Sequence, residues 1–277
     1  MNFADLHIHS LYSDGSYSPE EIVRRAKATG VGLISVTDHN VVEGTLAAAP
    51  LAVAAGLKYI CGVEIDAIHE GLDVHILCYG ANLADEALLG HIRHARNRLD
   101  YMSMELLRRM LPDYPRLSLE EYLDFPHDTS RGGWKMLQYL HAKGVTTDLR
   151  GGFGCYDRYG VTYADAGFDN AETIVRAIHT AGGRAVLAHP GVVFPTEYPG
   201  VFQAHVERAL DMGMDGVECH YLRHTRAITK RCLKICRERG LMITAGSDCH
   251  GAFNKNAIGQ TRTLIEQLDL KGLEWKA

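Results

Sequence analysis

Residues 3–9, with the sequence FADLHIH, open the chain with a short apolar run that ends in two histidines. Side chains alternate along a strand, so His7 and His9 are expected on the same face. Further apolar runs follow, most of them separated by helix-length amphipathic segments. This alternation is typical of repeated βα units around a parallel sheet. Strands are predicted near residues 3–8, 32–37, 58–65, 73–79, 184–188, 215–219 and 242–247.

Helix signals lie between these runs. Ser18, Pro19 and two acidic residues form a typical helix start, and the helix predicted there ends near Gly30. Apolar residues recur with helical spacing over 84–111, which predicts a long helix. The strand pattern then stops until about Gly167. We therefore predict an α/β barrel from residues 1–111 and 168–277, with residues 112–167 inserted as a helical cap.

The bulk composition excludes several classes of partner. The 277 residues carry a formal net charge of −5 without a run of five like charges, which argues against a nucleic-acid polymer or a membrane as partner. The seven cysteines are scattered, and no signal peptide or long apolar segment is recognisable. A cytoplasmic location is expected. Cys232 and Cys236, four residues apart, are predicted to share one helix face.

Polar residues gather where the predicted strands end or close to those ends. The carboxyl ends of parallel barrel strands converge, so groups placed there can form one site. Six separate runs deliver histidine, aspartate or glutamate to such positions. The nine candidate metal ligands are His7, His9, Asp14, His39, Glu64, His75, His189, Asp248 and His250.

Taken singly, these residues have ordinary explanations. His75 could be a hydrogen-bonded core residue, Asp14 could belong to an Asp-Gly turn, and Asp38 is left out of the ligand set as a residue that bonds a neighbouring ring or backbone. Nine such groups on one face would concentrate desolvated charge unless cations neutralise it. The number suits two or three divalent ions, and the mixture of imidazole and carboxylate favours Mn, Fe or Zn.

The ordered motifs resemble those of the polymerase-and-histidinol-phosphatase (PHP) family. They are residues 5–10 (DLHIHS), 37–40 (TDHN), 62–64 (GVE), 188–191 (AHPG) and 247–251 (SDCHG). Each motif alone is weak, but the ordered series is specific and leaves mainly the insert uncovered. The resemblance implies a distorted (β/α)7 TIM-like barrel whose two- or three-metal centre hydrolyses phosphate esters.

The resemblance also distributes the ligands among the ions. The first ion would be held by His7, His9, Glu64 and Asp248. Glu64 would bridge to a second ion, whose other ligands would be His75 and His189. The third would be held by Asp14, His39 and His250, although many relatives have histidine where Asp14 stands.

A metal-bridging hydroxide could attack phosphorus without a protein nucleophile, and the sequence lacks the motifs of a serine nucleophile or a P-loop. A histidine free of metal would be the natural general acid. His220 and His224, just beyond the strand that ends at Glu218, are the candidates, with a solvent-facing loop position as the alternative for each.

Cationic residues of the insert are expected to bind substrate phosphate. The candidates are Arg131, Lys135 and Arg158 in the insert and Arg223 near His220. Each of them alone could be a surface charge. Similarity to family members that cleave small nucleotide and sugar phosphates favours Arg131 and His224.

Within the family, the chain is similar to the small-metabolite branch, and especially to enzymes that open a cyclic phosphodiester and then release inorganic phosphate. Phosphoribosyl 1,2-cyclic phosphate is the substrate this implies. The alternatives are a phosphomonoesterase acting on a nucleotide 3′,5′-bisphosphate or histidinol phosphate. A metal-dependent amidohydrolase and a non-catalytic, metal-stabilised binding domain are alternatives of other classes.

Overall fold

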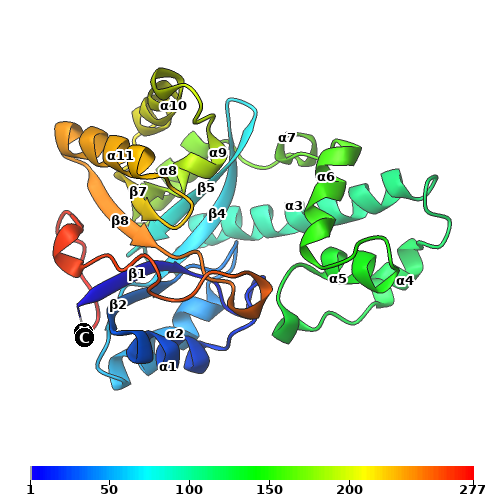
Figure 1. Cartoon of the computed structure of the whole chain (residues 1–277), viewed down its shortest axis with the longest axis horizontal. Coiled ribbons are helices and arrows are strands. Elements are labelled where there is room, and N and C mark those ends of the chain that lie inside the picture. Colours follow the sequence, from blue (N-terminus) through cyan, green and yellow to red (C-terminus); the bar gives the residue numbers. More distant parts are fainter. Residues whose placement is uncertain (1) are drawn as a thin grey trace.

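A computed structural model describes residues 2–277, which form alternating strands and helices (Figure 1). The strands are β1 (Phe3–Ile8), β2 (Val31–Val36), β3 (Lys58–Tyr59), β4 (Gly62–His69), β5 (Leu72–Tyr79), β6 (Arg184–Leu187), β7 (Gly216–Tyr221) and β8 (Met242–Gly246). The α-helices are α1 (Pro19–Thr29), α2 (Glu43–Ala54), α3 (Glu86–Met110), α4 (Leu119–Asp124), α5 (Lys135–Ala142), α6 (Phe153–Tyr159), α7 (Tyr163–Ala166), α8 (Ala171–Thr180), α9 (Pro190–Val193), α10 (Pro199–Asp211) and α11 (Arg226–Arg239). Short 3-10 turns are η1 (Thr129–Arg131), η2 (Arg150–Gly152), η3 (Gly251–Phe253) and η4 (Ile265–Gln267).

The strands form two sheets. The first has the order β1-β2-β3 and is parallel, and the second has the order β4-β5-β6-β7-β8. Isolated bridges join their edges: Ile8 pairs with Cys249 beyond β8, and His39 beyond β2 pairs with Glu64 in β4. The mixed α/β fold with parallel pairing is confirmed. A closed seven-stranded barrel remains a prediction, because the ladders leave two separate sheets.

The second sheet departs from the predicted pattern at β4 and β5. The predicted strand 58–65 is split into β3 and β4, and β5 runs antiparallel to both β4 and β6. The cause is a two-residue turn at Glu70 and Gly71, whose φ angles are 51° and 77°. Such a turn reverses the chain directly, whereas a parallel pair needs a long crossover. Glu64 lies near the start of β4. Its bridge to His39 places it beside the residues that follow β2.

Between Pro112 and Gly167 the regular elements of the described chain are helical, as predicted. Helix α3 leads away from the sheets, and α4 to α7 lie along it at one side of the molecule (Figure 1). Residues of this region pack into the same apolar core as the strands, including Leu140 and Val161. The division into barrel and cap stays a prediction.

The structure confirms the predicted start and end of α1 and the predicted helix face shared by two cysteines. The Ser18 hydroxyl accepts a hydrogen bond from the Glu21 backbone, and Gly30 ends α1 in a left-handed conformation. Cys232 and Cys236 are fully buried on one face of α11. Among residues 2–277, no helix combines the length and apolar character needed to cross a membrane.

Candidate metal centre and cavity

Nine side chains, seven of them buried and His75 and Asp248 partly exposed, form a group that we call the strand-end cluster. They come from β1, β4, β5 and the segments that follow β1, β2, β6 and β8. The members are the nine residues predicted from the sequence, namely His7, His9, Asp14, His39, Glu64, His75, His189, Asp248 and His250. The structure therefore brings together every predicted ligand, in groups of three or four whose donor atoms lie within 4.8 Å of one another.

The deepest part of the cluster converges on one point. His7 Nε2 lies 3.0 Å from both His9 Nε2 and Glu64 Oε2, and His9 Nε2 lies 3.1 Å from the same glutamate oxygen. Asp248 Oδ1 is 3.2 Å from His9 Nε2 and 3.6 Å from His7 Nε2. Ligand atoms around a tetrahedral ion at about 2.1 Å are roughly 3.4 Å apart. This donor set fits a divalent cation.

The Glu64 carboxylate divides its two oxygens between two sets of histidines. Oε2 faces His7 and His9, while Oε1 lies 3.0 Å from His75 Nδ1 and 3.1 Å from His189 Nε2. Glu64 is fully buried, so these contacts replace its hydration. A carboxylate in this position can bridge two ions.

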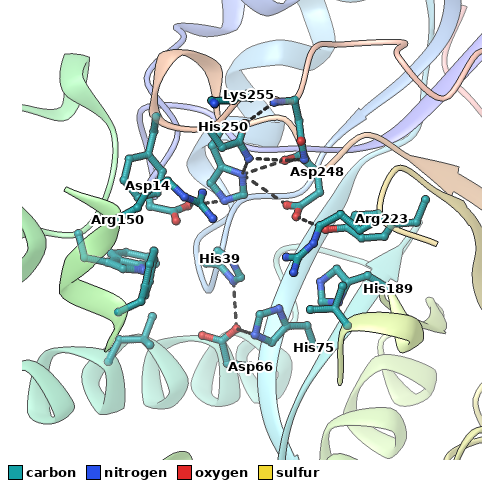
Figure 2. A pocket seen from close by; sticks show the side chains of 18 of the residues that line it. Asp14, His39, Asp66, His75, Arg150, His189, Arg223, Asp248, His250 and Lys255 are labelled. Carbon is teal, nitrogen blue, oxygen red and sulfur yellow. Dashed lines mark hydrogen bonds and ion pairs between the residues drawn. The ribbon is translucent and has the colours of Figure 1, made fainter. Parts of the chain in front are cut away.

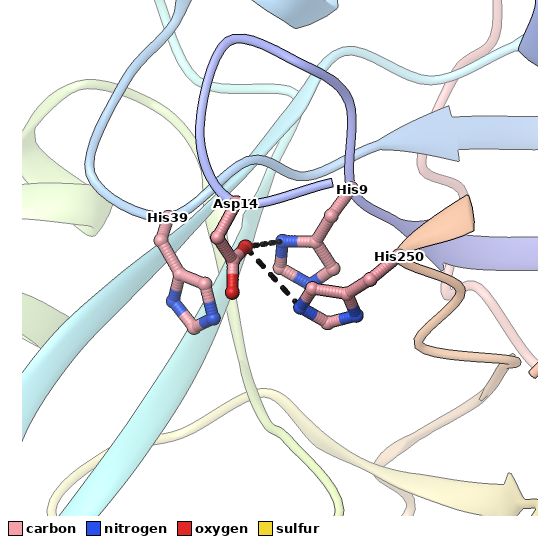
Figure 3. A group of neighbouring side chains, drawn as sticks. All are labelled: His9, Asp14, His39 and His250. Carbon is pink, nitrogen blue, oxygen red and sulfur yellow. Dashed lines mark ion pairs between the residues drawn. The ribbon is translucent and has the colours of Figure 1, made fainter. Parts of the chain in front are cut away.

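A third group consists of His9, Asp14, His39 and His250 (Figure 3). Asp14 Oδ1 is 3.2 Å from His250 Nε2 and 3.7 Å from His9 Nδ1, and His39 completes the group. His9 Nδ1 is buried and has no hydrogen-bond partner within the described chain, and the same holds for His189 Nδ1. Buried ring nitrogens rarely lack a partner. The unpaired nitrogen of His9 faces the carboxylate with which it could share a cation.

Strained backbone directs several side chains into the cluster. His189 and Asp248 have φ angles of 28° and 52°, which non-glycine residues seldom adopt. Asn40 has a φ of 53°, and its amide oxygen and nitrogen bond the backbone and carboxylate of Asp66. Such strain is typical of functional sites, where surrounding structure enforces it.

Two carboxylates that were not predicted as site residues hold the ligand rings. Glu218 Oε1 is 3.0 Å from His7 Nδ1, and its Oε2 accepts a 2.8 Å hydrogen bond from the His189 backbone. Asp66 Oδ1 is 3.0 Å from His39 Nδ1. Alternation could have indicated Asp66, which lies two residues beyond Glu64 on the same strand face, and Glu218 is the acidic residue of a predicted strand end.

Two motif carboxylates lie outside the cluster and fix its loops. Asp38 accepts hydrogen bonds from the Ser10 backbone at 2.7 Å and from the Ser13 hydroxyl at 2.6 Å. It therefore bonds backbone, as the sequence interpretation allowed. Asp5 accepts hydrogen bonds from the Ser247 and Gly259 backbone, and burial raises its pKa to about 6.

Neighbouring carboxylates raise the pKa of two histidines of the cluster, His7 and His250. Burial disfavours charge on His7, but Glu64 and Glu218 outweigh it and raise its pKa well above the ordinary value. Burial likewise opposes charge on His250, but Asp14 and Asp248 raise its pKa to about 9. Metal binding at neutral pH would therefore displace protons from these rings.

A main cavity of about 590 Å³ opens above the cluster (Figure 2). Six cluster members line it, and His7, His9 and Glu64 lie buried beneath. Three cationic side chains also line it: Arg150, Arg223 and Lys255. Arg223 was predicted, whereas Arg150 and Lys255 were not. Lys255 follows the 247–251 motif closely, a proximity that could have indicated it.

The other predicted substrate residues do not line the main cavity. Arg131 and Arg158 are exposed, and Lys135 donates a 2.7 Å hydrogen bond to the Leu123 carbonyl. His220 does not line it either. His224 Nε2 accepts a hydrogen bond from Gly191, and its Nδ1 is 3.2 Å from the Cys219 carbonyl.

These backbone contacts occupy both ring nitrogens of His224. Burial lowers its pKa to about 4, so the ring is neutral at pH 7. The geometry therefore does not support general-acid catalysis or phosphate binding by His224, because its polar atoms fix the loop between β7 and α11.

Fold and cluster define a class: α/β proteins whose converging histidines and carboxylates can hold several cations. The chain belongs to the PHP domain family, whose model matches residues 5–182. A solved structure from Bifidobacterium adolescentis with the provisional name metal-dependent phosphoesterase has a similar fold. It is 22% identical, with a TM-score of 0.76, and the match covers 94% of this chain and 91% of that one.

Three curated relatives match most of the chain. A phosphoribosyl 1,2-cyclic phosphate 1,2-diphosphodiesterase from Eggerthella lenta is 27% identical, covering 91% of this chain and 95% of the relative. A 3′,5′-nucleoside bisphosphate phosphatase from Chromobacterium violaceum is 29% identical, covering 89% and 86%. The 5′-3′ exoribonuclease Rnm from Salmonella typhimurium is 26% identical, covering 89% and 84%. Similar proteins thus carry the names of three phosphoesterase activities.

Proposed function

We propose that the chain hydrolyses phosphate esters of a small metabolite at two or three divalent ions held by the strand-end cluster. Membership of the PHP family makes it a hydrolase acting on phosphoric ester bonds. The observation that carries the proposal is Glu64, whose two oxygens face separate sets of histidines at 3.0 to 3.1 Å. This arrangement suits adjacent ions rather than one isolated ion.

His7, His9, Glu64 and Asp248 would hold one ion, and Glu64 with His75 and His189 would hold the second. Asp14, His39 and His250 would hold the third, with His9 Nδ1 close by. When bound, these ions would supply an activated water for attack on phosphorus and would neutralise phosphoryl charge. Mn, Fe and Zn all suit such ligands.

The cations around the main cavity would orient the substrate. Arg150, Arg223 and Lys255 line the cavity from different segments, so their charges surround the entrance to the cluster (Figure 2). Guanidinium groups bind phosphate oxygens with paired, directional hydrogen bonds. A neutral amide or lactone would have no need of three cations, which favours a phosphate ester over an amidohydrolase substrate.

For the substrate, we propose a cyclic phosphodiester of the phosphoribosyl 1,2-cyclic phosphate type. One water would open the ring to a monoester, and a second would release inorganic phosphate. The name of the Eggerthella relative supports this substrate. A nucleoside 3′,5′-bisphosphate is the second candidate, supported by the Chromobacterium relative and by a ring-lined cavity beside the cluster.

Elemental analysis coupled to a phosphate-release screen tests the proposal. The panel contains the cyclic diester, the nucleoside bisphosphate, histidinol phosphate, a short 5′-phosphorylated RNA, an amide and a lactone. We expect two to three ions per chain and phosphate release from the cyclic diester. Release from monoesters alone would exclude the cyclic diester, while turnover of no phosphate ester by metal-replete protein would support the binding-domain alternative.

Ligand variants extend the test. His7→Ala and Asp248→Ala should each lose bound metal and phosphate release together, because both side chains contact the deepest donor group. His179→Ala is the matched control, since His179 pairs with Asp215 at the surface. Unchanged metal content in the two ligand variants would contradict the assigned site.

A further inference from the structure

Strand β7 carries an extra residue in its pairing with β8. The register shifts between Glu218 and His220, so that Cys219 is inserted into an otherwise regular parallel ladder. Side chains alternate along a regular strand, which would place Glu218 and His220 on one face and Tyr221 on the other. An inserted residue re-aims the side chains that follow it. Tyr221 consequently faces the strand-end cluster together with Glu218.

Tyr221 thus occupies the place that alternation assigns to His220. Tyr221 lines the main cavity, whereas His220 does not. Cys219 lies on the opposite side, with its sulfur 3.7 Å from a thiol of α11. The Tyr221 ring is buried and packs against the rings of His189 and His224, at centre-to-centre distances of 5.4 and 5.3 Å. These contacts fix the direction of the Tyr221 hydroxyl.

The two carboxylate oxygens of Asp248 have different partners. Oδ2 accepts a 2.9 Å hydrogen bond from the Tyr221 hydroxyl. Oδ1 faces the cluster, 3.2 Å from His9 Nε2 and 3.4 Å from His250 Nδ1. One oxygen is therefore held at the cavity wall, and the other is directed toward the histidines of the proposed metal site.

Other contacts already fix the backbone of Asp248. Its N–H donates a 2.9 Å hydrogen bond to the His7 carbonyl, and its carbonyl accepts hydrogen bonds from the side-chain amides of Asn254 and Asn256. The remaining freedom lies in the side chain, whose terminal torsion is soft and can exchange the two oxygens. The hydrogen bond from Tyr221 opposes that rotation.

We propose that Tyr221 is a positioning residue for Asp248, whose Oδ2 it holds so that Oδ1 alone faces the first ion. A carboxylate can bind an ion through one oxygen or through both. The hydrogen bond to Tyr221 restricts Asp248 to one of them. The inference rests on the proposed function, in which Asp248 is a metal ligand, and it gives a role to a residue outside the nine candidate ligands.

Tyr221→Phe tests this role, because it removes the hydroxyl and keeps the packed ring. Affinity for Mn²⁺ is measured by competition with a chromophoric chelator at a temperature where the metal-free protein is folded. We expect about a 10- to 100-fold loss of affinity, the range typical of an orienting partner of a metal ligand. Tyr159→Phe is the matched control, since it removes a hydroxyl that donates a 2.6 Å hydrogen bond to Asp113, which is not a candidate ligand. Its affinity should stay within about twofold of wild type.

A double-mutant cycle shows whether the effect passes through Asp248. In an Asp248→Ala background the Tyr221 hydroxyl has no carboxylate to hold, so adding Tyr221→Phe should change the remaining Mn²⁺ affinity by less than about twofold. At saturating Mn²⁺, Tyr221→Phe should lower kcat for phosphate release about tenfold and leave KM within about twofold. The cations that line the main cavity are unchanged in this variant, which is why KM is preserved.

Three results would overturn the positioning role. The first is a Tyr221→Phe protein with the Mn²⁺ affinity of wild type, and the second is a raised KM with unchanged affinity, which would assign the hydroxyl to the substrate. The third is a lower unfolding temperature of the metal-free variant with unchanged affinity, which would show a purely structural role. In all three the wild-type protein still binds Mn²⁺, whereas failure of the proposed function would appear as a wild-type protein that binds no divalent ion.

Discussion

Replacing Glu218 with glutamine tests whether one buried carboxylate positions ligands of two proposed ions. Its oxygens serve different partners: Oε1 faces His7 Nδ1 at 3.0 Å, and Oε2 accepts the His189 backbone N–H at 2.8 Å. A proton on His7 Nδ1 leaves Nε2 free to bind a cation. Glutamine has one acceptor oxygen, so it can satisfy only one of these two donors.

The expected effect follows from that count. If the NH2 group of the glutamine faces His7 Nδ1, the ring is driven to the tautomer with a proton on Nε2, the atom that points into the cluster. If the NH2 group instead faces the His189 backbone N–H, that buried N–H loses its acceptor, which costs about 1 to 3 kcal/mol. Loss of an orienting partner typically lowers metal affinity about 10- to 100-fold, equivalent to about 1.4 to 2.7 kcal/mol. We expect Glu218→Gln to weaken metal binding within this range.

Competition with a chromophoric chelator measures the affinity for Mn²⁺ and Zn²⁺, and thermal unfolding with and without chelator measures the coupling to stability. Glu238→Gln is the control, because Glu238 is exposed on α11. Glu218→Asp keeps both acceptor oxygens and should retain more affinity than the glutamine variant. A Glu218→Gln protein that binds metal within twofold of wild type would refute the positioning role.

Two further outcomes are expected. A Cβ at Gly246 would overlap His7 Cβ and Glu218 Oε1, so Gly246→Ala should lower the free energy of unfolding by about 1 to 3 kcal/mol and reduce bound metal, as measured by denaturant titration and elemental analysis. For His224, the folded pKa of about 4 lies below the ordinary 6.5, so its stabilising contribution is complete above pH 6.5 and declines as the pH falls toward 4. Between pH 7 and pH 5, the fall in the free energy of unfolding should be about 2 kcal/mol smaller in His224→Gln than in wild type; an equal fall in both would show that His224 is not buried as a neutral ring.

Much of the candidate metal centre could be predicted because short stretches of sequence determine where its residues lie. His7 and His9 share a face through alternation, and their position at the end of β1 follows from the apolar run before them. The helix that begins after Ser18 could also be predicted, because its N-cap and its C-terminal glycine are each local sequence signals. Convergence of the ligands then follows from strand ends that meet at one edge of a sheet.

The residues that the sequence did not reveal depend on long-range packing. Arg150 lies in the short 3-10 turn η2 and Lys255 in an irregular segment, and neither segment carries a sequence pattern that fixes the direction of these long side chains. Arg131, which the resemblance favoured, and Lys135 were both predicted in the insert, yet neither lines the main cavity. The antiparallel β5 strand was missed for a different reason. Its turn signal at Glu70 and Gly71 is short, and the expected repeat of βα units outweighed it.

Two carboxylates explain why ligands so far apart in sequence act as one unit. Glu64 contacts four histidines from three strands or the segments just after them through its two oxygens, and Glu218 fixes the ring of His7 while holding the strained backbone of His189. A change at either carboxylate must therefore alter more than one proposed ion position. Deleting an outer ligand such as His250 removes contacts from one group only. The number of bound ions per chain should consequently fall further in Glu64 and Glu218 variants than in His250 variants. Such a result would show that metal binding depends on the hydrogen bonds of these two carboxylates.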